Sequence, residues 1–203
     1  YHAKLGKLPF SAIKVIMIDL FSALIFLKKA NVIHCDLKPE NIMFIDEETY
    51  NVVVGDFGLA KINDLNKLQT DFNVQTCWYR APEVALHIPY SYESDLWSVG
   101  VILMELIIDY PIFRAKTNTD LFYLFIKLLG DNPASMLQLN PELRNFTMMG
   151  SKRISLDMHL DKITQELKKI SNKAIEELID GIIVWEPKKR LSLRDCFDFA
   201  NEI

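Results

Sequence analysis

The stretch that decides the fold reads Val32-Ile33-His34-Cys35-Asp36-Leu37-Lys38-Pro39-Glu40-Asn41, and Asp56-Phe57-Gly58 begins fifteen residues after its end. Between the two motifs, the apolar runs 42–45 and 51–55 flank a polar turn, which predicts a β-hairpin. A hairpin returns the chain to the edge at which it started. The sequence therefore predicts one polar cluster that combines the end of the first motif with the start of the second.

The side chains of this cluster have the chemistry that phosphoryl transfer requires: a group that receives a hydroxyl, a cation near the phosphates and oxygen ligands for magnesium. Asp36 can accept and orient the hydroxyl, and Lys38 can reach a transferred phosphate. Asn41 and Asp56 offer the hard oxygen ligands that Mg²⁺ prefers. Each piece alone has an ordinary structural explanation, but their joint occurrence in a matching context favours the functional one.

The two motifs resemble those of the eukaryotic protein kinases, whose catalytic loop reads H-R-D-L-x-x-x-N and whose metal motif reads D-F-G. The resemblance implies that Asp36 and Lys38 are catalytic residues. It also implies ATP and Mg²⁺ as cofactors, with Lys38, Asn41 and Asp56 binding the cofactor. The metal ligands among them are Asn41 and Asp56.

Residues 56–83 are predicted to form the activation segment, which ends at Ala81-Pro82-Glu83. Its last part, Thr76-Cys77-Trp78-Tyr79-Arg80, resembles the substrate-docking stretch of the CMGC group, which contains the cyclin-dependent, MAP and DYRK-type kinases. By this resemblance Thr76 bridges the two catalytic residues and belongs with them. Arg80 is implied to bind substrate, by shaping a pocket that favours proline after the target Ser or Thr.

The resemblance also places Glu40 on the substrate side, where its carboxylate can attract a basic residue upstream of the target. A carboxylate that is simply solvated is an equally good explanation of this residue. Structural roles are implied for His34 and Phe57 and for three residues further along the chain. Among those three, Asp95 holds the backbone of the catalytic loop, and Arg190 pairs with Glu83 to fix the end of the activation segment. As a helix cap alone, Asp95 would be unremarkable.

Three positions differ from regulated relatives. Most kinases have Arg where this chain has Cys35. The positions at which relatives carry the activating Thr and Tyr are Asp71 and Asn73, neither of which can be phosphorylated. Because Asp71 carries one negative charge where a phosphate carries about 1.5 to 2, we hypothesise that the segment is ordered without phosphorylation. A solvated loop acid is an equal alternative for Asp71, and neighbouring Thr70 remains a candidate for modification.

Helical periodicity predicts a mainly α fold around the hairpin. The expected helices run from a cap at Ser11 to Ala30, from Ser94 to about Asp109, from Asp120 to Gly130 and from Asn172 to Val184. The second of these is apolar almost all round and is therefore expected to be buried. Lys14 lies in an S-A-I-K sequence that imitates a kinase motif, but inside a helix it is expected to be a surface lysine.

The whole chain, residues 1–203, is predicted to be the large, C-terminal lobe of a protein kinase domain. The glycine-rich loop, strand lysine and paired glutamate of the small lobe do not occur in this sequence, so the small lobe is expected to be absent and the chain to be a fragment. Residues 131–170 correspond to the CMGC-type insert, where a docking protein could bind. The basic pair Lys152-Arg153 within it is better explained as a solvated loop.

Composition narrows the class of protein and the cellular compartment in which it is expected. With 203 residues, half of them hydrophobic, the chain can bury the core of one domain. A net charge of −4 gives no reason to expect a nucleic-acid partner. The three cysteines are odd in number and lack metal-ligand spacing, which favours a cytoplasmic or nuclear location. We find no apolar run of membrane-spanning length and no signal-peptide pattern, so no membrane partner is expected.

Two functions from different classes fit these observations. The first is a Ser/Thr protein kinase of the CMGC group, which transfers the γ-phosphate of Mg-ATP to a hydroxyl of a protein substrate. These 203 residues alone are expected to be inactive and not to bind ATP tightly. The second is a pseudokinase-like scaffold or binding module that lacks the ATP-gripping small lobe. The intact set of Asp36, Lys38, Asn41 and Asp56 counts against the second, because pure scaffolding has no chemical need for it.

Overall fold

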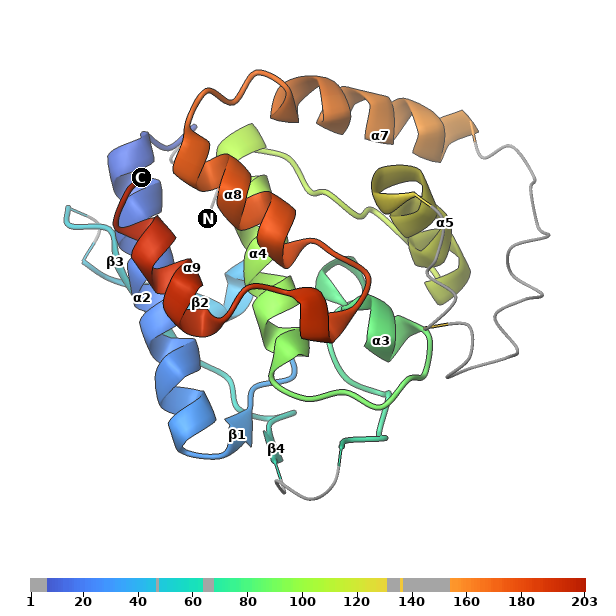
Figure 1. Cartoon of the computed structure of the whole chain (residues 1–203), viewed down its shortest axis with the longest axis horizontal. Helices are drawn as coiled ribbons and strands as arrows, with labels where there is room; N and C mark the ends of the chain where they lie inside the picture. Colours follow the sequence, from blue (N-terminus) through green and yellow to red (C-terminus); the bar gives the residue numbers. More distant parts are fainter. Residues whose placement is uncertain (1–6, 47, 64–67, 131–135, 137–153) are drawn as a thin grey trace.

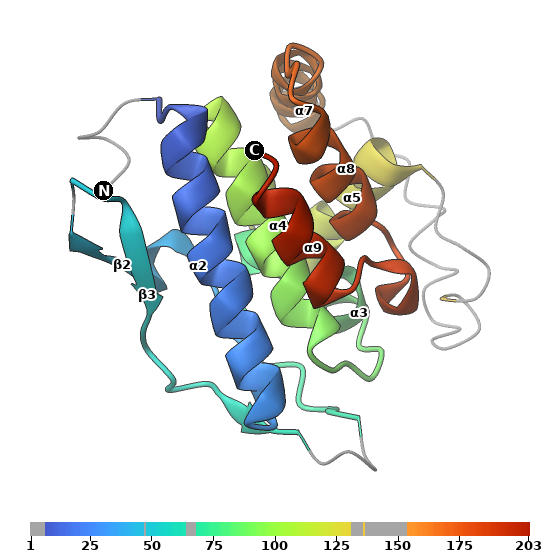
Figure 2. The same ribbon diagram turned by 60° about the vertical axis from the view of Figure 1, so that its left-hand side comes forward.

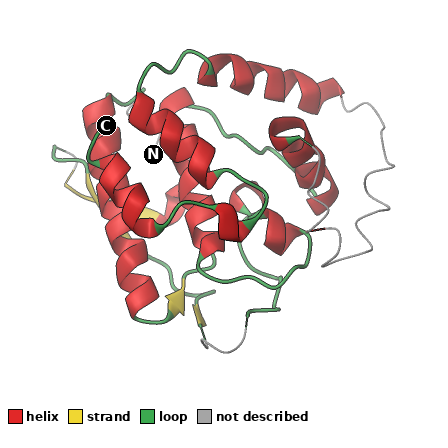
Figure 3. Cartoon of the chain, in the orientation of Figure 1, coloured by secondary structure: helices red, strands yellow, loops and turns green. Residues whose placement is uncertain are grey.

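The computed structural model describes residues 7–46, 48–63, 68–130, 136 and 154–203 (Figure 1). These residues form a mainly helical fold with short strands, which confirms the predicted fold class (Figure 3). The strands are β1 (Val32–Ile33), β2 (Ile42–Asp46), β3 (Asn51–Val54) and β4 (Lys61–Ile62). The helices are α2 (Phe10–Lys29), α3 (Pro82–Ala85), α4 (Glu93–Ile108), α5 (Asn118–Leu129), α7 (Ile154–Leu167), α8 (Lys173–Ile182) and α9 (Leu193–Ala200).

Helix α4 is the centre of the fold. Every residue from Ser94 to Ile107 is buried, as its nearly continuous apolar sequence predicts. Both ribbon views place it between α2 on one side and α8 on the other (Figures 1 and 2). Gly100 permits the close approach of α8, because a Cβ at this position would lie 2.5 Å from a methyl carbon of Ile182. The helix ends at Asp109, which adopts the left-handed conformation common after a last turn.

Helix α2 starts at Phe10, so the predicted cap at Ser11 is wrong. Pro9 precedes the helix in an extended conformation, and its carbonyl accepts the backbone N–H groups of Ala12 and Ile13 at 3.0 and 3.1 Å. Since Pro9 already occupies the capping position, the Ser11 side chain lies exposed inside the first turn. Lys14 lies within this helix as expected, and its ammonium group reaches the carbonyl of Asn201 at 2.5 Å.

By length and composition, α2 is also long and apolar enough to cross a membrane, so the expectation that no segment reaches that length is wrong. The expectation considered uninterrupted apolar runs, whereas α2 remains strongly apolar despite Lys14 and Asp19. A buried core helix meets the same criterion. Eight residues of α2 lie in the hydrophobic core, and the helix packs against α4, α9 and β3.

The predicted hairpin is present. Strands β2 and β3 pair antiparallel, with Ile42 opposite Val54 and Phe44 opposite Val52. The carboxylate of Asp19 on α2 attaches the hairpin to the helix, because it accepts the backbone N–H of Val52 at 2.9 Å and the side-chain amide of Asn51 at 3.1 Å. A second antiparallel pair joins β1 to β4. The two pairs together bring the 32–41 loop beside the chain that follows Asp56.

The predicted insert, residues 131–170, lies mostly outside the described residues, and so do Lys152 and Arg153. Its described part includes α7, which packs against α4 and α5. The figures show α7 at the end of the molecule distant from β1 and β4 (Figures 1 and 2).

A buried ion pair joins the end of the predicted activation segment to the C-terminal part of the chain. The two guanidinium NH groups of Arg190 contact the two carboxylate oxygens of Glu83, each at 2.7 Å, and both side chains are 0% exposed. Arg190 also donates to the carbonyl of Glu93 at 2.6 Å and lies over the Trp97 ring. The expected contact between Arg190 and Glu83 is therefore present, and it ties α3 to the start of α4.

We predict that Arg190→Ala lowers the free energy of unfolding by about 3 to 5 kcal/mol, because it leaves the Glu83 carboxylate buried without its partner. Denaturant unfolding of the full-length protein measures this loss. Arg194→Ala is the matched control: its ion pair with Asp198 is exposed, so the loss should stay below about 1 kcal/mol. Equal losses in the two variants would contradict this account of the buried pair.

Candidate active site

The two sequence motifs meet where the 32–41 loop passes the hairpin. The loop enters through β1 and leaves through a single 3₁₀ turn at Pro39–Asn41 directly into β2. Where β3 leaves the hairpin ladder, next to the start of β2, the backbone N–H of Gly55 donates to the carbonyl of Asn41 at 2.8 Å. Asn41 and Asp56 therefore lie at the same end of the hairpin, as the sequence predicts.

Asp36, Lys38 and Thr76 form a closed triangle of polar contacts. The Lys38 ammonium group lies 2.7 Å from one carboxylate oxygen of Asp36 and donates to the Thr76 hydroxyl at 3.1 Å. The hydroxyl and the backbone N–H of Thr76 donate to the other carboxylate oxygen at 2.7 and 2.9 Å. The structure thus places Thr76, forty residues along the chain, between the two predicted catalytic side chains.

These contacts decide the charge of Asp36. Burial works to raise the pKa of this carboxyl, but the hydrogen bonds from Lys38 and Thr76 outweigh burial and hold the pKa below its usual value. The same hydrogen bond to Asp36 raises the pKa of Lys38. At neutral pH the site therefore contains a carboxylate and an ammonium ion in direct contact.

Asn41 and Asp56 could hold a magnesium ion. The amide nitrogen of Asn41 donates to the carbonyl and the carboxylate of Asp36 at 2.8 and 3.3 Å, which leaves its amide oxygen as the atom for a metal. Asp56 is exposed, and one of its oxygens accepts the N–H of Gly58 at 3.1 Å. Magnesium is commonly bound by one or two such oxygens together with phosphate oxygens and water. The donor set therefore fits this ion.

His34 connects the 32–41 loop to the chain before Asp56. Its Nδ1 accepts the backbone N–H of Asp36 at 3.2 Å, so its Nε2 carries the proton that is donated to the carbonyl of Gly55 at 2.9 Å. Burial lowers the pKa of His34, which keeps the ring neutral. The ring packs against Phe57, with centroids 4.9 Å apart, so the structure brings both predicted structural residues together.

Asp95, in the first turn of α4, holds the backbone of the 32–41 loop. Its two carboxylate oxygens accept the backbone N–H groups of His34 at 2.6 Å and of Cys35 at 2.9 Å. Complete burial raises the pKa of Asp95 to about 7, and the two N–H donors oppose this shift. Cys35 has a φ of 66°, a left-handed conformation that is uncommon for residues other than glycine. Asp95 therefore stabilises a strained turn immediately before Asp36.

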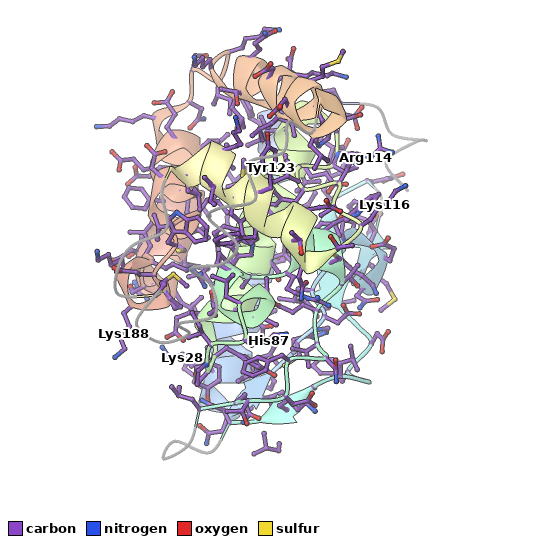
Figure 4. The ribbon with its side chains drawn as sticks, turned by 90° about the vertical axis from the view of Figure 1, so that its right-hand side faces the viewer. Lys28, His87, Arg114, Lys116, Tyr123 and Lys188 are labelled. Atoms are coloured by element: carbon purple, nitrogen blue, oxygen red, sulfur yellow. The ribbon has the colours of Figure 1, made fainter. Side chains whose placement is uncertain are left out.

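The predicted activation segment contacts the body of the fold around Asp71. The carboxylate of Asp71 lies 2.7 Å from the ammonium group of Lys61, and the Tyr90 hydroxyl donates to the carbonyl of Asp71 at 2.9 Å. His87, labelled in Figure 4, stacks on Phe72 with centroids 5.0 Å apart. The thiol of Cys35 lies buried nearby, and burial raises its pKa to about 12, so this position carries no charge.

The side of the site on which Glu40 lies contains features that the sequence did not reveal. A cavity of about 450 Å³ lies beside the 3₁₀ turn, and its lining includes Glu40, Trp78 and Glu105. Glu105 accepts a hydrogen bond from the Tyr79 hydroxyl at 2.8 Å. The available signal for Glu105 was that it is the one acidic residue in the otherwise apolar stretch from Val99 to Ile108 of α4. Arg114, at one edge of Figure 4, lies over the Trp78 ring.

Comparison with known proteins agrees with this geometry. Residues 2–199 match the family model described as "Protein kinase domain". The chain is 37% identical over 145 residues to Homeodomain-interacting protein kinase 1 of Caenorhabditis elegans, which covers 70% of the chain and 17% of that protein. It is 32% identical over 179 residues to the mitogen-activated protein kinase HOG1 of Debaryomyces hansenii, which covers 88% of the chain and 45% of that protein.

A probable dual specificity protein kinase YAK1 homolog of Encephalitozoon cuniculi is 38% identical over 126 residues, covering 62% of the chain and 30% of that protein. The chain thus spans less than half the length of each of these relatives. Its mainly helical fold corresponds to the large lobe of a kinase domain. The chain belongs to the protein kinase domain family, and its relatives place it in the CMGC group.

Proposed function

We propose that the protein is a Ser/Thr kinase that transfers the γ-phosphate of Mg-ATP to a hydroxyl of a protein substrate. The observation that carries this proposal is the triangle of Asp36, Lys38 and Thr76, in which an ionised carboxylate and a cation lie in contact. A scaffold has no need of this arrangement. The transfer requires mainly positioning and charge compensation, and these residues supply both.

Each residue has a distinct task in this proposal. Asp36 accepts the hydrogen bond of the substrate hydroxyl and orients its oxygen toward the phosphate. Lys38, whose ammonium group contacts the Asp36 carboxylate, lies within reach of the phosphate and stabilises the negative charge of the transferred group. Asn41 and Asp56 hold Mg²⁺, which when bound neutralises the charge on the phosphates of ATP. The Thr76 hydroxyl bonds to both the carboxylate and the ammonium group, and so keeps the two in contact.

A preference for proline after the target residue is supported by the contacts of Arg80. Its Nε and one terminal nitrogen donate to the carbonyl of Gln75 at 3.2 and 2.7 Å, and another terminal nitrogen donates to Asn118 at 2.7 Å. The Gln75 carbonyl is thus already engaged and unavailable to a substrate. Proline has no backbone N–H to satisfy, whereas any other residue at that position would lose a hydrogen bond on binding.

A preference for a basic residue upstream of the target is supported by the cavity beside Glu40. Glu105 also lines this cavity, and Trp78 supplies an aromatic wall. Carboxylates beside an aromatic face suit a guanidinium group.

We further propose a cytoplasmic or nuclear location, no nucleic-acid or membrane partner, and a docking protein at residues 131–170. Each of these concerns the whole protein.

The pseudokinase-like scaffold remains a second candidate because of the outer face of the hairpin. Three large apolar side chains on β2 and β3 are 43 to 66% exposed, namely Met43, Ile45 and Val53. An exposed apolar face of this kind is suited to covering by another protein surface. The scaffold needs no phosphate transfer, so the following experiment separates the two candidates.

We predict that Asp36→Asn in the full-length protein lowers kcat for phosphorylation of a basic, proline-containing protein by about 10²- to 10⁴-fold, the range that a positioned acid or base contributes. Steady-state transfer of radiolabelled γ-phosphate measures the effect. Cys35→Ser is the matched control, because Cys35 is an uncharged neighbour whose backbone, rather than its side chain, contacts Asp95. Equal rates for Asp36→Asn and the unmodified protein would reject the kinase proposal.

We also propose that the segment around Asp71 is held without phosphorylation. In the full-length protein, Asp71→Ala and Lys61→Met should each lower the initial rate several-fold, and the double variant should lose no more than either single variant because the two share one ion pair. Phosphatase treatment should leave the unmodified protein equally active. Asp198→Ala, which removes an exposed acid on α9, serves as control. Unchanged activity of Asp71→Ala would show that Asp71 is only a solvated loop acid.

A further inference from the structure

Tyr110, just after the end of α4, is the centre of a cluster of basic side chains. The guanidinium carbon of Arg114 lies 5.7 Å from the centre of the Tyr110 ring, and the ammonium group of Lys162 lies 4.3 Å from it. The ring of His159 packs on the same residue, with centroids 5.2 Å apart. Because Arg114 belongs to the loop between α4 and α5 and the other two belong to α7, the cluster joins two distant parts of the chain.

Hydrogen bonds hold this cluster in place. Nε2 of His159 donates to the carbonyl of Ile112 at 2.8 Å, which attaches α7 to the loop after α4. Burial lowers the pKa of His159, and the positive charges of Arg114 and Lys162 lower it further, so the ring stays neutral. One terminal nitrogen of Arg114 donates to the Tyr110 hydroxyl at 3.0 Å. The two cations therefore have defined positions although both side chains are exposed.

The positive charge of the cluster is not balanced by its neighbours. Among the residues that the structure describes, neither Arg114 nor Lys162 takes part in an ion pair. The three acids of α7 leave this charge in place, because Asp157 and Glu166 contact other lysines and Asp161 pairs with neither cation. Two like charges held beside one ring repel each other, so an anion that contacts both is attracted by both.

Trp78 connects the cluster to the proposed substrate groove. Its side chain lines the cavity beside Glu40, and the guanidinium carbon of Arg114 lies 5.8 Å from the centre of its ring. Its indole N–H donates to the carbonyl of Ala115, the residue after Arg114, at 3.0 Å. A peptide whose target hydroxyl lies at Asp36 and whose basic residue lies in the cavity would reach the cluster on passing Trp78.

We propose that Arg114 and Lys162 bind the phosphate of a phosphoserine or phosphothreonine in the protein substrate, upstream of the basic residue that lies beside Glu40. This inference rests on the proposed function. A phosphorylated side chain carries about 1.5 to 2 negative charges and three strong acceptor oxygens. Only one N–H of Arg114 is used by Tyr110, and a guanidinium group can bond to two phosphate oxygens at once. The substrate is then a protein that has already been phosphorylated at a nearby residue.

A phosphate suits these two cations better than a carboxylate does. The carboxylate of Asp or Glu has one negative charge and two oxygens, so it balances only one of the cations. A phosphate has the charge to balance both and enough oxygens to bond to both. We therefore expect the site to prefer a phosphorylated residue over an acidic one at the same position.

The test measures binding and phosphate transfer separately, with the full-length protein. Each fluorescent peptide contains a target threonine followed by proline, an arginine upstream of it, and a serine at one of several positions further upstream. That serine is either free or phosphorylated. At one spacing we expect the phosphorylated peptide to bind about tenfold more tightly in fluorescence anisotropy, as expected for hydrogen bonds to a charged group. In transfer to the threonine, the difference should appear in KM and not in kcat.

We predict that Arg114→Gln and Lys162→Gln each remove most of this preference, because each variant loses one of the two cations. Both side chains are exposed, so neither change opens a cavity in the core. Lys188→Gln is the matched control, since it removes an exposed cation on the opposite side of the view from Arg114 in Figure 4 and should leave the preference unchanged.

The outcomes separate this inference from the proposed function. Equal binding of free and phosphorylated peptides at every spacing contradicts the inference, and transfer to the threonine would still support the kinase. The inference is also wrong if both variants keep the preference of the unmodified protein, because the phosphate then binds elsewhere. Preferential binding that depends on Arg114 and Lys162, without any transfer, overturns the proposed function and leaves phosphate binding at this site established.

Discussion

The candidate site depends on the hydrogen bonds between the buried carboxylate of Asp95 and the backbone of the 32–41 loop. This carboxylate accepts two consecutive backbone N–H groups, those of His34 and Cys35, and so holds the loop through a left-handed residue. The next residue along is Asp36. Removing a carboxylate from water is costly, and two N–H donors at short distance offset that cost while fixing the loop on the rigid helix α4. The position of Asp36 is thereby set by a helix whose residues from Ser94 to Ile107 are all buried.

The same helix also holds the second half of the site. The carboxamide of Gln75 bonds to Ser94 and Ser98 near the start of α4. A few residues later, Glu83 is fixed by Arg190, which also bonds to the backbone of Glu93. The chain that carries Thr76 is therefore attached to the start of α4 on both sides of this residue. The triangle of Asp36, Lys38 and Thr76 forms because the 32–41 loop and the chain that carries Thr76 are both attached to the start of α4.

What the sequence could predict was local or motif-based. The hairpin follows from two apolar runs around a polar turn, and the burial of α4 follows from its nearly continuous apolar composition. The contact between Arg190 and Glu83 was predicted because both belong to recognisable motifs. The predicted cap of α2 was wrong. Ser11 is a residue type that is preferred at the N-cap position, but Pro9 already occupies that position in an extended conformation.

The missed features depend on tertiary contacts. Gln75 has no local pattern that reveals its buried partners, which lie up to 23 residues away. Asp19 holds β3 from a helix more than thirty residues earlier.

The most direct test of the central claim is phosphate transfer by the full-length protein, with the product mapped by mass spectrometry. With Mg²⁺ and ATP, we predict phosphate on a serine or threonine of a protein substrate, and no transfer after the metal is chelated. Tight binding of Mg-ATP without any transfer to protein would contradict the claim, and it would favour the scaffold.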